Sequence, residues 1–261
     1  MRPPSLLSGV SAECGIGAGP SNESRIVGGV STNVTQWPWQ LGDRVIFSHS
    51  PAASDGGVDV LPAGLWLACR ASHCVRLRSL AVHAGFRRHN YTHDLALAAL
   101  VRTLPPPAAP ICLPSGEQAL GGRCVITGWG DKEPARRAAT SAGSKAQWLQ
   151  QALLPVLPWG LCRRAYPWAA ALRRWLLCAG VWKGGRGPCH GDSGGPLQCQ
   201  RPDGRWQLSG LVSWGAGCGR PRQPAMFVRV AAYRRWIRQA GQRLQPVALP
   251  LHEDASHTFL V

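Results

Sequence analysis

Ten cysteines spread from Cys14 to Cys218 constrain the fold of this 261-residue chain more than any other feature. They do not form the tight pairs that ligate a metal ion, so we expect disulfide bonds and an oxidising compartment. No His, Cys and carboxylate cluster has ligand spacing, so we predict no metal and no cofactor. Hydrophobic residues make up 45% of the chain, which argues against disorder. No apolar run approaches the roughly 20 residues that cross a bilayer, so we expect no membrane span.

A glycine-rich stretch surrounds Ser193, Gly187-Pro-Cys-His-Gly-Asp-Ser-Gly-Gly-Pro196. A serine hydroxyl is a poor nucleophile at neutral pH and needs a base beside it to take its proton. The flanking glycines let the backbone turn sharply and let main-chain N–H groups approach a reacting carbonyl. Gly-Asp-Ser-Gly alone also fits an ordinary turn. The longer string resembles the nucleophile loop of the chymotrypsin-like, or trypsin-family, serine proteases.

Other segments extend this resemblance. Short β-prone runs bounded by turns, such as Cys124–Gly130 and Trp206–Trp214, indicate an all-β protein. Residues Ala231–Ala240 instead have apolar side chains at helical spacing and resemble the family's C-terminal helix. The resemblance implies two six-stranded antiparallel Greek-key barrels, of which the first can be incomplete, followed by a C-terminal α-helix.

The predicted domain plan follows from the same segments. We expect a pro-segment over residues 1–25, a protease domain over 26–241 and a loose tail over 242–261. The barrel halves are expected over about 26–115 and 116–230, and the helix over 231–241. Three glycosylation sequons begin at Asn22, Asn33 and Asn90 and agree with a secreted glycoprotein. The first residues lack an apolar core of signal-peptide length, so we expect either a signal on a segment absent here or an incomplete sequence.

Arg25-Ile26-Val-Gly-Gly resembles the zymogen activation junction of the family. In that family, cleavage frees the Ile amino group, which pairs with the aspartate before the nucleophile; here these groups are Ile26 and Asp192. A buried ammonium–carboxylate pair is tolerable only when both partners are present, so cleavage can order the site. The resemblance therefore implies an activating protease that cleaves after arginine. The alternative is a plain Arg-Ile dipeptide in a strand.

The family's disulfides, carried over to this chain, use eight of the ten cysteines. The implied pairs are Cys14–Cys112, Cys124–Cys199, Cys162–Cys178 and Cys189–Cys218. The remaining pair, Cys69–Cys74, would close a very small loop, and we do not expect it to tie two strands together.

The resemblance also implies a catalytic triad. Asp94, in Tyr91-Thr-His-Asp-Leu-Ala-Leu, matches the family's Asn-Asp-Ile-Ala-Leu-Leu motif and would orient the base. The nearest match to the family's Thr-Ala-Ala-His-Cys motif is Ala71-Ser-His-Cys74, which makes His73 the base. Only about 20 residues separate His73 from Asp94, roughly half the usual interval, and the resemblance fails over residues 41–82. His83 resembles instead a non-catalytic histidine before the aspartate.

The substrate site follows from the same motifs. The N–H groups of Gly191 and Ser193 would form the oxyanion hole. Ser213-Trp214-Gly215 resembles the strand that pairs with an extended peptide. Gly187 stands where trypsin-like members have an aspartate, and Gly215 and Ala225 occupy wall positions. An uncharged pocket would make a buried arginine costly, so we predict cleavage after Phe, Tyr, Leu or Met.

The formal charge of +16, nearly all from arginine, would attract heparin-like polyanions. A G+C-rich coding sequence explains the arginines equally well. No nucleic-acid-binding motif is present. We therefore predict a secreted serine endopeptidase with peptide or protein substrates and with serpin-type or other inhibitors. The alternative is a catalytically inactive homologue that binds partners, with Arg229, Arg234, Arg235 and Arg238 as candidate polyanion contacts.

Overall fold

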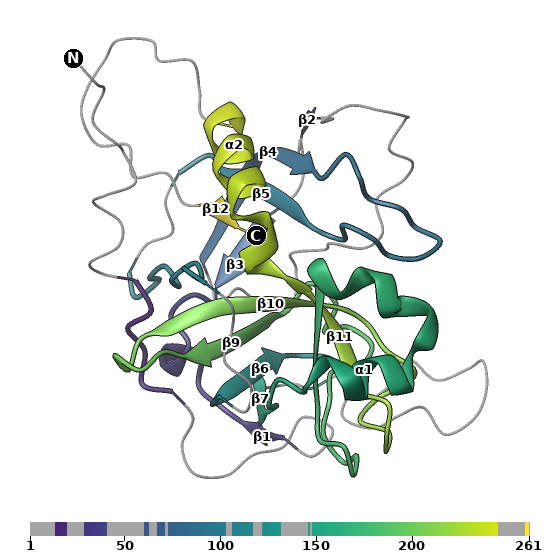
Figure 1. Cartoon of the computed structure of the whole chain (residues 1–261). Coiled ribbons are helices and arrows are strands. Elements are labelled where there is room, and N and C mark those ends of the chain that lie inside the picture. Colours follow the sequence, from purple (N-terminus) through teal and green to yellow (C-terminus); the bar gives the residue numbers. More distant parts are fainter. Residues whose placement is uncertain are drawn as a thin grey trace, which may run out of the picture.

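The computed structural model is an antiparallel β protein with a C-terminal helix (Figure 1). The structure describes residues 14–19, 29–40, 60–62, 67–70, 73–102, 106–116, 122–131, 146, 148–244 and 259–260. Side chains are described in these ranges except at residues 60–62, 67–70, 73–74 and 259–260. None of the helices in these ranges is both long and apolar enough to span a bilayer.

The larger sheet has seven strands in the order β1-β7-β6-β9-β10-β11-β8, and all neighbouring strands are antiparallel. These strands are β1 (Val30–Ser31), β6 (Cys124–Gly128), β7 (Gln150–Leu153), β8 (Leu176–Ala179), β9 (Pro196–Gln200), β10 (Trp206–Trp214) and β11 (Ala225–Arg229). Their inward side chains, including Ile126, Leu197 and Phe227, form one buried core. Both β-prone runs singled out in the sequence are strands of this sheet.

The chain beyond β7 meets the last strand of the same sheet. The Leu157 N–H donates to the Cys178 carbonyl at 2.9 Å, and the Gly180 N–H donates to the Pro155 carbonyl at 3.0 Å. An isolated antiparallel bridge joins Val156 to Ala179 of β8. The six strands from β7 round to β8 therefore return on themselves.

The smaller sheet follows the path β12-β5-β4-β2, with β3 also paired to β4. Its strands are β2 (Val60–Pro62), β3 (Leu67–Arg70), β4 (His73–Val82), β5 (Ala96–Leu100) and β12 (Phe259–Leu260). In the pairing of β4 with β5, Val82 lies opposite Ala96 and Leu77 opposite Leu100. Within the described residues, the smaller sheet thus has five strands, one of them from the tail, where the resemblance implied a six-stranded barrel that can be incomplete.

Helix α2 (Arg234–Leu244) follows a 3-10 turn, η3 (Val230–Tyr233), and lies over β4 and β5 in Figure 1. It ends at Leu244 instead of residue 241 because Leu244 is buried with Ala81 and Leu97 of the smaller sheet. The Arg78 guanidinium donates to the Leu244 carbonyl at 3.0 Å and so satisfies a helix-terminal acceptor. The tail predicted to be loose contains β12, which pairs with β5.

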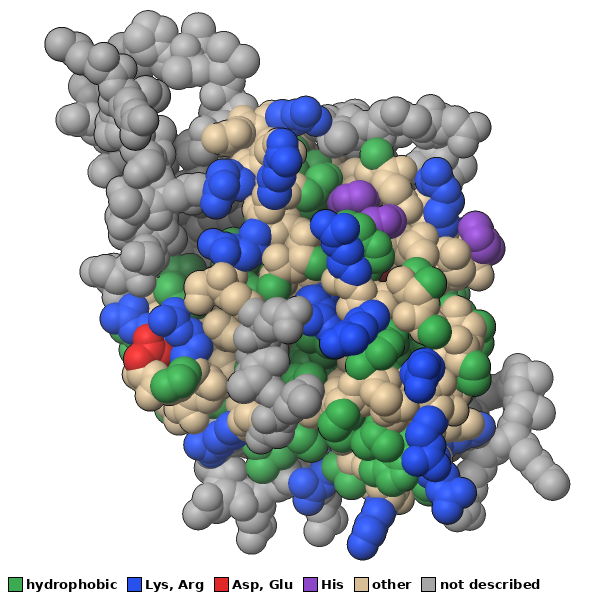
Figure 2. Space-filling model, viewed as in Figure 1, with side chains coloured by type: hydrophobic (Ala, Val, Ile, Leu, Met, Phe, Trp, Pro, Cys, Tyr) green, Lys and Arg blue, Asp and Glu red, His purple; other side chains and the backbone are tan. Residues whose placement is uncertain are grey.

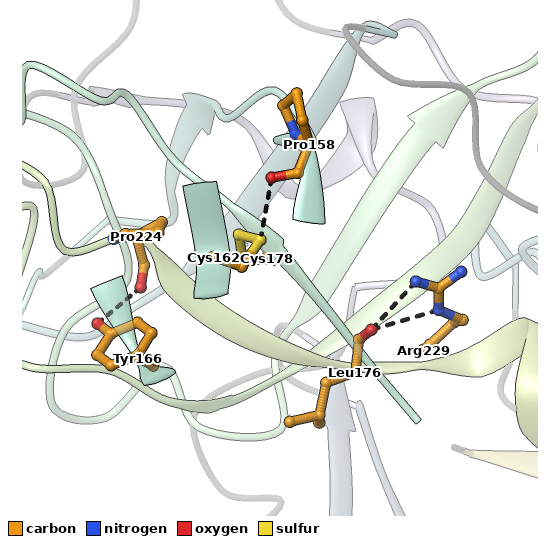
Figure 3. Close-up of a disulfide and its surroundings, with 7 residues drawn as sticks. All are labelled: Pro158, Cys162, Tyr166, Leu176, Cys178, Pro224 and Arg229. Atoms are coloured by element: carbon orange, nitrogen blue, oxygen red, sulfur yellow. Dashed lines mark hydrogen bonds between the residues drawn. A yellow bond between two sulfur atoms is a disulfide. The ribbon is translucent and has the colours of Figure 1, made fainter. Parts of the chain in front are cut away.

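Three short helical segments are absent from the sequence prediction. Asn33 caps the 3-10 turn η1 (Val34–Gln36), and α1 (Trp159–Ala165) and η2 (Pro167–Arg174) lie between β7 and β8. Pro158 precedes α1 and Pro167 is the first residue of η2, and each segment is too short for a helical period to be recognised. Figure 3 shows how they are held: the Tyr166 hydroxyl donates to the Pro224 carbonyl at 2.9 Å, beside the Cys162–Cys178 disulfide.

Four disulfides join described residues, and they link the pairs that the resemblance implied: Cys14–Cys112, Cys124–Cys199, Cys162–Cys178 and Cys189–Cys218. Three of them lie within the half that contains the seven-stranded sheet. Cys124 and Cys199 are directly opposite each other on β6 and β9. Such cross-links are typical of domains that fold in an oxidising compartment.

Candidate active site

Ser193 lies in an exposed turn between the Cys189–Cys218 disulfide and the start of β9. Gly191 has φ +95° and Gly194 has φ +77°, conformations that residues with a side chain rarely adopt. The Gly194 N–H donates to the Val212 carbonyl of β10 at 2.8 Å, which fixes the turn against the sheet. The glycines around the serine are therefore required by the backbone and leave the hydroxyl open to solvent.

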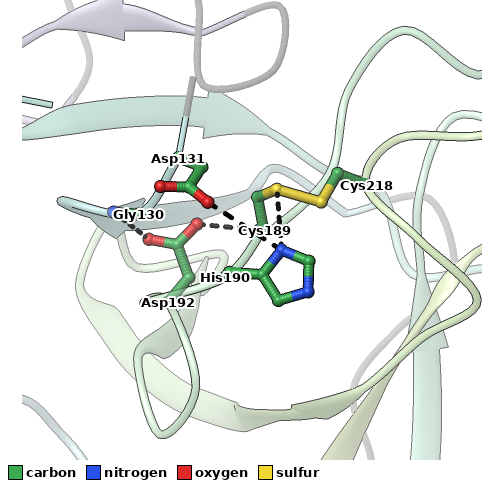
Figure 4. A network of polar contacts seen from close by, with 6 residues as sticks. All are labelled: Gly130, Asp131, Cys189, His190, Asp192 and Cys218. Carbon is green, nitrogen blue, oxygen red and sulfur yellow. Dashed lines mark hydrogen bonds and ion pairs between the residues drawn. A yellow bond between two sulfur atoms is a disulfide. The ribbon is translucent and has the colours of Figure 1, made fainter. Parts of the chain in front are cut away.

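The Asp192 side chain, which precedes the exposed Ser193, points into the protein interior. The Asp192 carboxylate is buried and accepts the Gly130 N–H at 2.8 Å and the Cys189 N–H at 2.9 Å (Figure 4). Burial raises the pKa of Asp192, the two backbone donors oppose that rise, and the nearby Asp131 adds to it. Among the described residues, no cationic side chain pairs with this carboxylate. A buried carboxylate in this position is suited to receiving a positive group.

Two glycines make room for Asp192, and the sequence analysis did not assign them a role. A Cβ added to Gly128 or to Gly130 would lie inside the contact distance of the Asp192 carboxylate. In the sequence, their only sign is the Thr-Gly-Trp-Gly run at the end of β6, and such a run is also typical of an ordinary strand end. The absence of side chains at these two glycines therefore leaves the space that the Asp192 carboxylate occupies.

Asp94 lies at the junction of the two sheets. Its carboxylate accepts the hydroxyl of Ser213 at 2.6 Å, which joins the predicted triad acid to the predicted substrate strand β10. The Leu95 N–H donates to the His93 carbonyl at 2.8 Å, so Asp94 is the central residue of a γ-turn. The structure thus brings together two site residues that are far apart in the sequence.

His73 does not lie beside Asp94 in this structure. It is the first residue of the ten-residue strand β4, whereas Asp94 precedes Ala96, which pairs with Val82 at the other end of β4. Nine residues of extended strand span about 30 Å, well beyond the reach of an imidazole. The His73 side chain itself is outside the described residues. The backbone register therefore separates the predicted base from the predicted acid.

The register of β3 on β4 corrects the expectation for the small cysteine loop. Cys69 and Cys74 lie directly opposite each other on the antiparallel strands β3 and β4. A bond between them would therefore tie two strands together, contrary to the sequence analysis. Their side chains, and the Arg25-Ile26 junction, are outside the described residues.

The predicted specificity residues are small and closely packed. Gly187 is buried, and a Cβ added there would lie 3.0 Å from the Gly219 nitrogen. A Cβ on Gly215 would lie 3.6 Å from the Ala225 Cα. Trp214 is half-buried and stacks against the exposed Trp168 with ring centroids 4.7 Å apart. The surface at these positions is uncharged and apolar.

One possible metal-ligand group is accounted for by a disulfide. Atoms of Cys189, His190 and Cys218 lie within 4.8 Å of one another, but the two sulfurs are bonded to each other and cannot act as thiolate ligands.

A family model described as Trypsin matches residues 70–237 of the chain. The chain belongs to the trypsin family of serine proteases. The trypsin-family match begins three residues before His73, so it includes residues 70–82, a stretch where the motifs themselves matched poorly.

The curated relatives are larger members of the family. Transmembrane protease serine 9 of Rattus norvegicus is 36% identical over 256 residues, which cover 87% of this chain and 23% of that protein. Transmembrane protease serine 5 of Homo sapiens is 34% identical over 250 residues, which cover 84% of this chain and 52% of that protein. Transmembrane protease serine 7 of Mus musculus is 34% identical over 240 residues, with shares of 82% and 28%. This trypsin-family chain therefore spans between about a quarter and a half of these relatives.

Proposed function

We propose that the chain is a serine endopeptidase unit that binds an extended peptide along Ser213–Gly215 and hydrolyses it through Ser193. The observation that carries the proposal is the hydrogen bond from the Ser213 hydroxyl to Asp94, because it links the triad acid to the substrate strand. The exposed Ser193 and the positive φ of Gly191 agree with a nucleophile beside oxyanion-hole amides. The return of six strands on themselves agrees with the family's six-stranded Greek-key barrel.

Activation by cleavage at Arg25–Ile26 is part of the proposal. The buried Asp192 carboxylate, whose pKa burial raises, would be stabilised by a free Ile26 ammonium. The disulfides support an extracellular location, and the sequons at Asn33 and Asn90 are candidate glycan sites. The partners are then peptide or protein substrates, an activating protease and inhibitors of the serpin type.

Hydrolysis requires a base at Asp94, and His73 is the proposed one. Because β4 carries His73 away from Asp94, the β3–β4 hairpin has to adopt another arrangement for the triad to assemble. The separation of these residues favours a second candidate function, a homologue that binds peptides without cleaving them.

Labelling with a fluorophosphonate probe, before and after cleavage at Arg25–Ile26, distinguishes the two functions. Labelling that appears only on cleavage, and that is lost in both Ser193→Ala and His73→Ala, supports the endopeptidase with this base. Labelling that survives His73→Ala excludes His73 as the base. An unlabelled but correctly cleaved and folded protein supports the binding homologue.

Polyanions are further candidate partners. Among the side chains that the structure describes, the acidic ones are Asp94, Asp131, Asp192 and Asp203, and of these only Asp203 is exposed, where it pairs with Arg201 at 3.0 Å. Figure 2 shows Lys and Arg side chains distributed over the whole visible face. Retention on immobilised heparin beyond that of a neutral control at moderate salt tests this attraction.

A further inference from the structure

A cluster of imidazole and aromatic rings lies next to Asp94 in the chain and joins residues from both halves. The rings of His83, which follows β4, and His93, which precedes Asp94, stack with centroids 4.6 Å apart and planes 5° from parallel. Trp175 packs against His93 with centroids 4.7 Å apart, and Trp236 of α2 packs against His83 at 5.2 Å. The cluster therefore attaches the Asp94 loop to the other half of the molecule.

The backbone of His93 is unusual. Its φ of +52° lies in the left-handed region, which histidine visits more readily than most residues but which still costs energy. Its carbonyl accepts the Leu95 N–H in the γ-turn around Asp94, and the Leu95 carbonyl accepts the His83 N–H at 3.2 Å. The conformation of His93 therefore sets the direction in which the Asp94 side chain leaves the chain.

The ring of His93 is also held by a polar contact. Its Nδ1 lies 3.0 Å from the hydroxyl of Tyr233, a buried residue of η3. Burial and the negative charge of Asp94 raise the pKa of Tyr233, so the phenol keeps its proton. Burial lowers the pKa of His93, so the imidazole is neutral at pH 7. A neutral phenol and a neutral imidazole share one hydrogen bond in either direction.

We propose that His93 is a positioning residue for Asp94: its left-handed backbone and its clamped ring hold the γ-turn that aims the Asp94 carboxylate at Ser213. The proposal rests on the proposed function, in which Asp94 is the catalytic acid. His93 acts through Asp94, because its own Nδ1 is directed to Tyr233. The motif that Asp94 matches has asparagine before the aspartate, which also tolerates left-handed backbone but does not supply the stacked ring.

The stacking of His83 on His93 is sensitive to low pH. The titratable and charged groups beside the two histidines are Arg87 of the same loop, Asp94 and Tyr233 of η3; Arg174 lies 5.0 Å over the ring of Trp175, which in turn packs against His93. Burial and the neighbouring His93 lower the pKa of His83 to about 4. Protonation of both stacked rings places two positive charges side by side near Arg87, and the stack then separates.

The test compares three variants of the cleaved protein with the wild type. His93→Gly keeps the left-handed backbone and removes the ring, His93→Asn keeps a polar side chain, and His89→Ala changes an exposed histidine of the same loop. The readouts are kcat and KM on a peptide substrate and the rate of fluorophosphonate labelling, all normalised to the folded fraction. Because a small misplacement of a catalytic group can lower the rate about 100-fold, we expect His93→Gly to lower kcat about 10- to 100-fold, with little change in KM.

We expect a smaller loss in His93→Asn and none in His89→Ala. The acid limb of the wild-type pH–rate profile should be steeper than that of His93→Asn, because only the wild type contains the stacked pair. If His93→Gly does not fold, Tyr233→Phe, which removes only one oxygen atom, decides the question: we expect it to lower kcat several-fold at an unchanged folded fraction.

The outcomes separate this proposal from the function on which it rests. A labelled wild type with variants of unchanged kcat overturns the positioning role and leaves the endopeptidase function standing. A lower melting temperature with unchanged kcat per folded molecule also overturns it, since the cluster would then be only structural. A wild type that stays unlabelled after cleavage overturns the proposed function and this role together.

Discussion

The two halves of the molecule present their site residues in different ways. In the half built on the seven-stranded sheet, Ser193 follows a disulfide and precedes β9, and an isolated bridge joins Val156 to Ala179 of β8. In the half built on β4 and β5, Asp94 sits in a loop whose conformation depends on rings supplied by η3 and α2. The proposed nucleophile, Ser193, is thus fixed within one half, whereas the proposed acid, Asp94, is fixed by contacts between halves.

This difference indicates which of the proposed catalytic residues is more easily displaced. A turn fixed by covalent and local backbone bonds keeps its geometry when distant residues change. A loop fixed by packing between halves responds to the pH and to the stability of the other half.

The largest expected effect concerns the predicted substrate pocket, in the half that contains the seven-stranded sheet. The resemblance predicts that Gly187 forms the pocket floor, and an uncharged floor would make burial of an arginine side chain costly, so cleavage after Phe should exceed cleavage after Arg by more than about 100-fold in kcat/KM. Matched peptides that differ only at the residue before the scissile bond measure this ratio. Efficient cleavage of the arginine peptide, abolished by Ser193→Ala, would contradict the assignment of the pocket.

The second expected effect distinguishes the cut from the uncut protein. Asp192→Asn should destabilise the cut protein by about 3–5 kcal/mol, because the buried Ile26 ammonium then lacks its partner. In the uncut protein the same change removes a buried charge, so little or no loss is expected. Chemical denaturation of both forms measures the difference, and equal losses in the two forms would argue against the Ile26–Asp192 pair.

The sign of the pH dependence provides a control for that experiment. Burial raises the pKa of Asp192, so the folded, uncut protein holds this proton more tightly than the unfolded chain. The contribution of Asp192 to stability is therefore present at low pH and is lost as the pH rises through the raised pKa. The Asp192→Asn variant should lack this loss.

The third expected effect is a local clash. Gly128→Ala should destabilise the protein by about 1–3 kcal/mol, because the new methyl group meets the Asp192 carboxylate in a closely packed site. Gly160→Ala is the matched control: nothing lies within 4 Å of its added Cβ, and alanine favours helix α1. Thermal unfolding of both variants measures the contrast. A Gly128→Ala protein as stable as the control would mean that Asp192 moves freely.

The smallest expected effect concerns His83, in the half that contains Asp94. Because the pKa of His83 is lowered to about 4, the folded protein binds fewer protons there than the unfolded chain between about pH 6.5 and pH 4. The contribution of His83 is therefore present above about pH 6.5 and is lost as the pH falls toward 4. Melting temperatures of wild type and His83→Asn over this range measure it. If the melting temperature of the variant falls with pH as steeply as that of the wild type, His83 does not cause the loss of stability at low pH.

The sequence predicted the elements whose signals are local. Glycines around Ser193, the helical period of α2 and the motif at Asp94 each depend on a few neighbouring residues, and the structure contains the corresponding turn, helix and loop. The four disulfide pairs came from the resemblance, because spacing alone leaves many pairings open.

The remaining features depend on contacts between distant residues. The position of His73 follows from the register of β4 on β5, which no short motif specifies. The His93–Tyr233 contact joins residues 140 positions apart. The sequence contains only one indication of it, which is a histidine where the matched motif has asparagine. Segments α1 and η2 were missed because two prolines divide them into pieces too short to show a period.

The bridge between Val156 and Ala179 has a further consequence for how the molecule avoids self-association. An unpaired strand edge is a template on which another chain can add a strand. Residues 155–157 cover the edge of β8, whereas among the described strands the path of the larger sheet ends at β1 and that of the smaller sheet ends at β2 and β12. Aggregation of partly unfolded molecules should therefore begin at these terminal strands rather than at β8, and substitutions that shield them should keep the protein in solution longest.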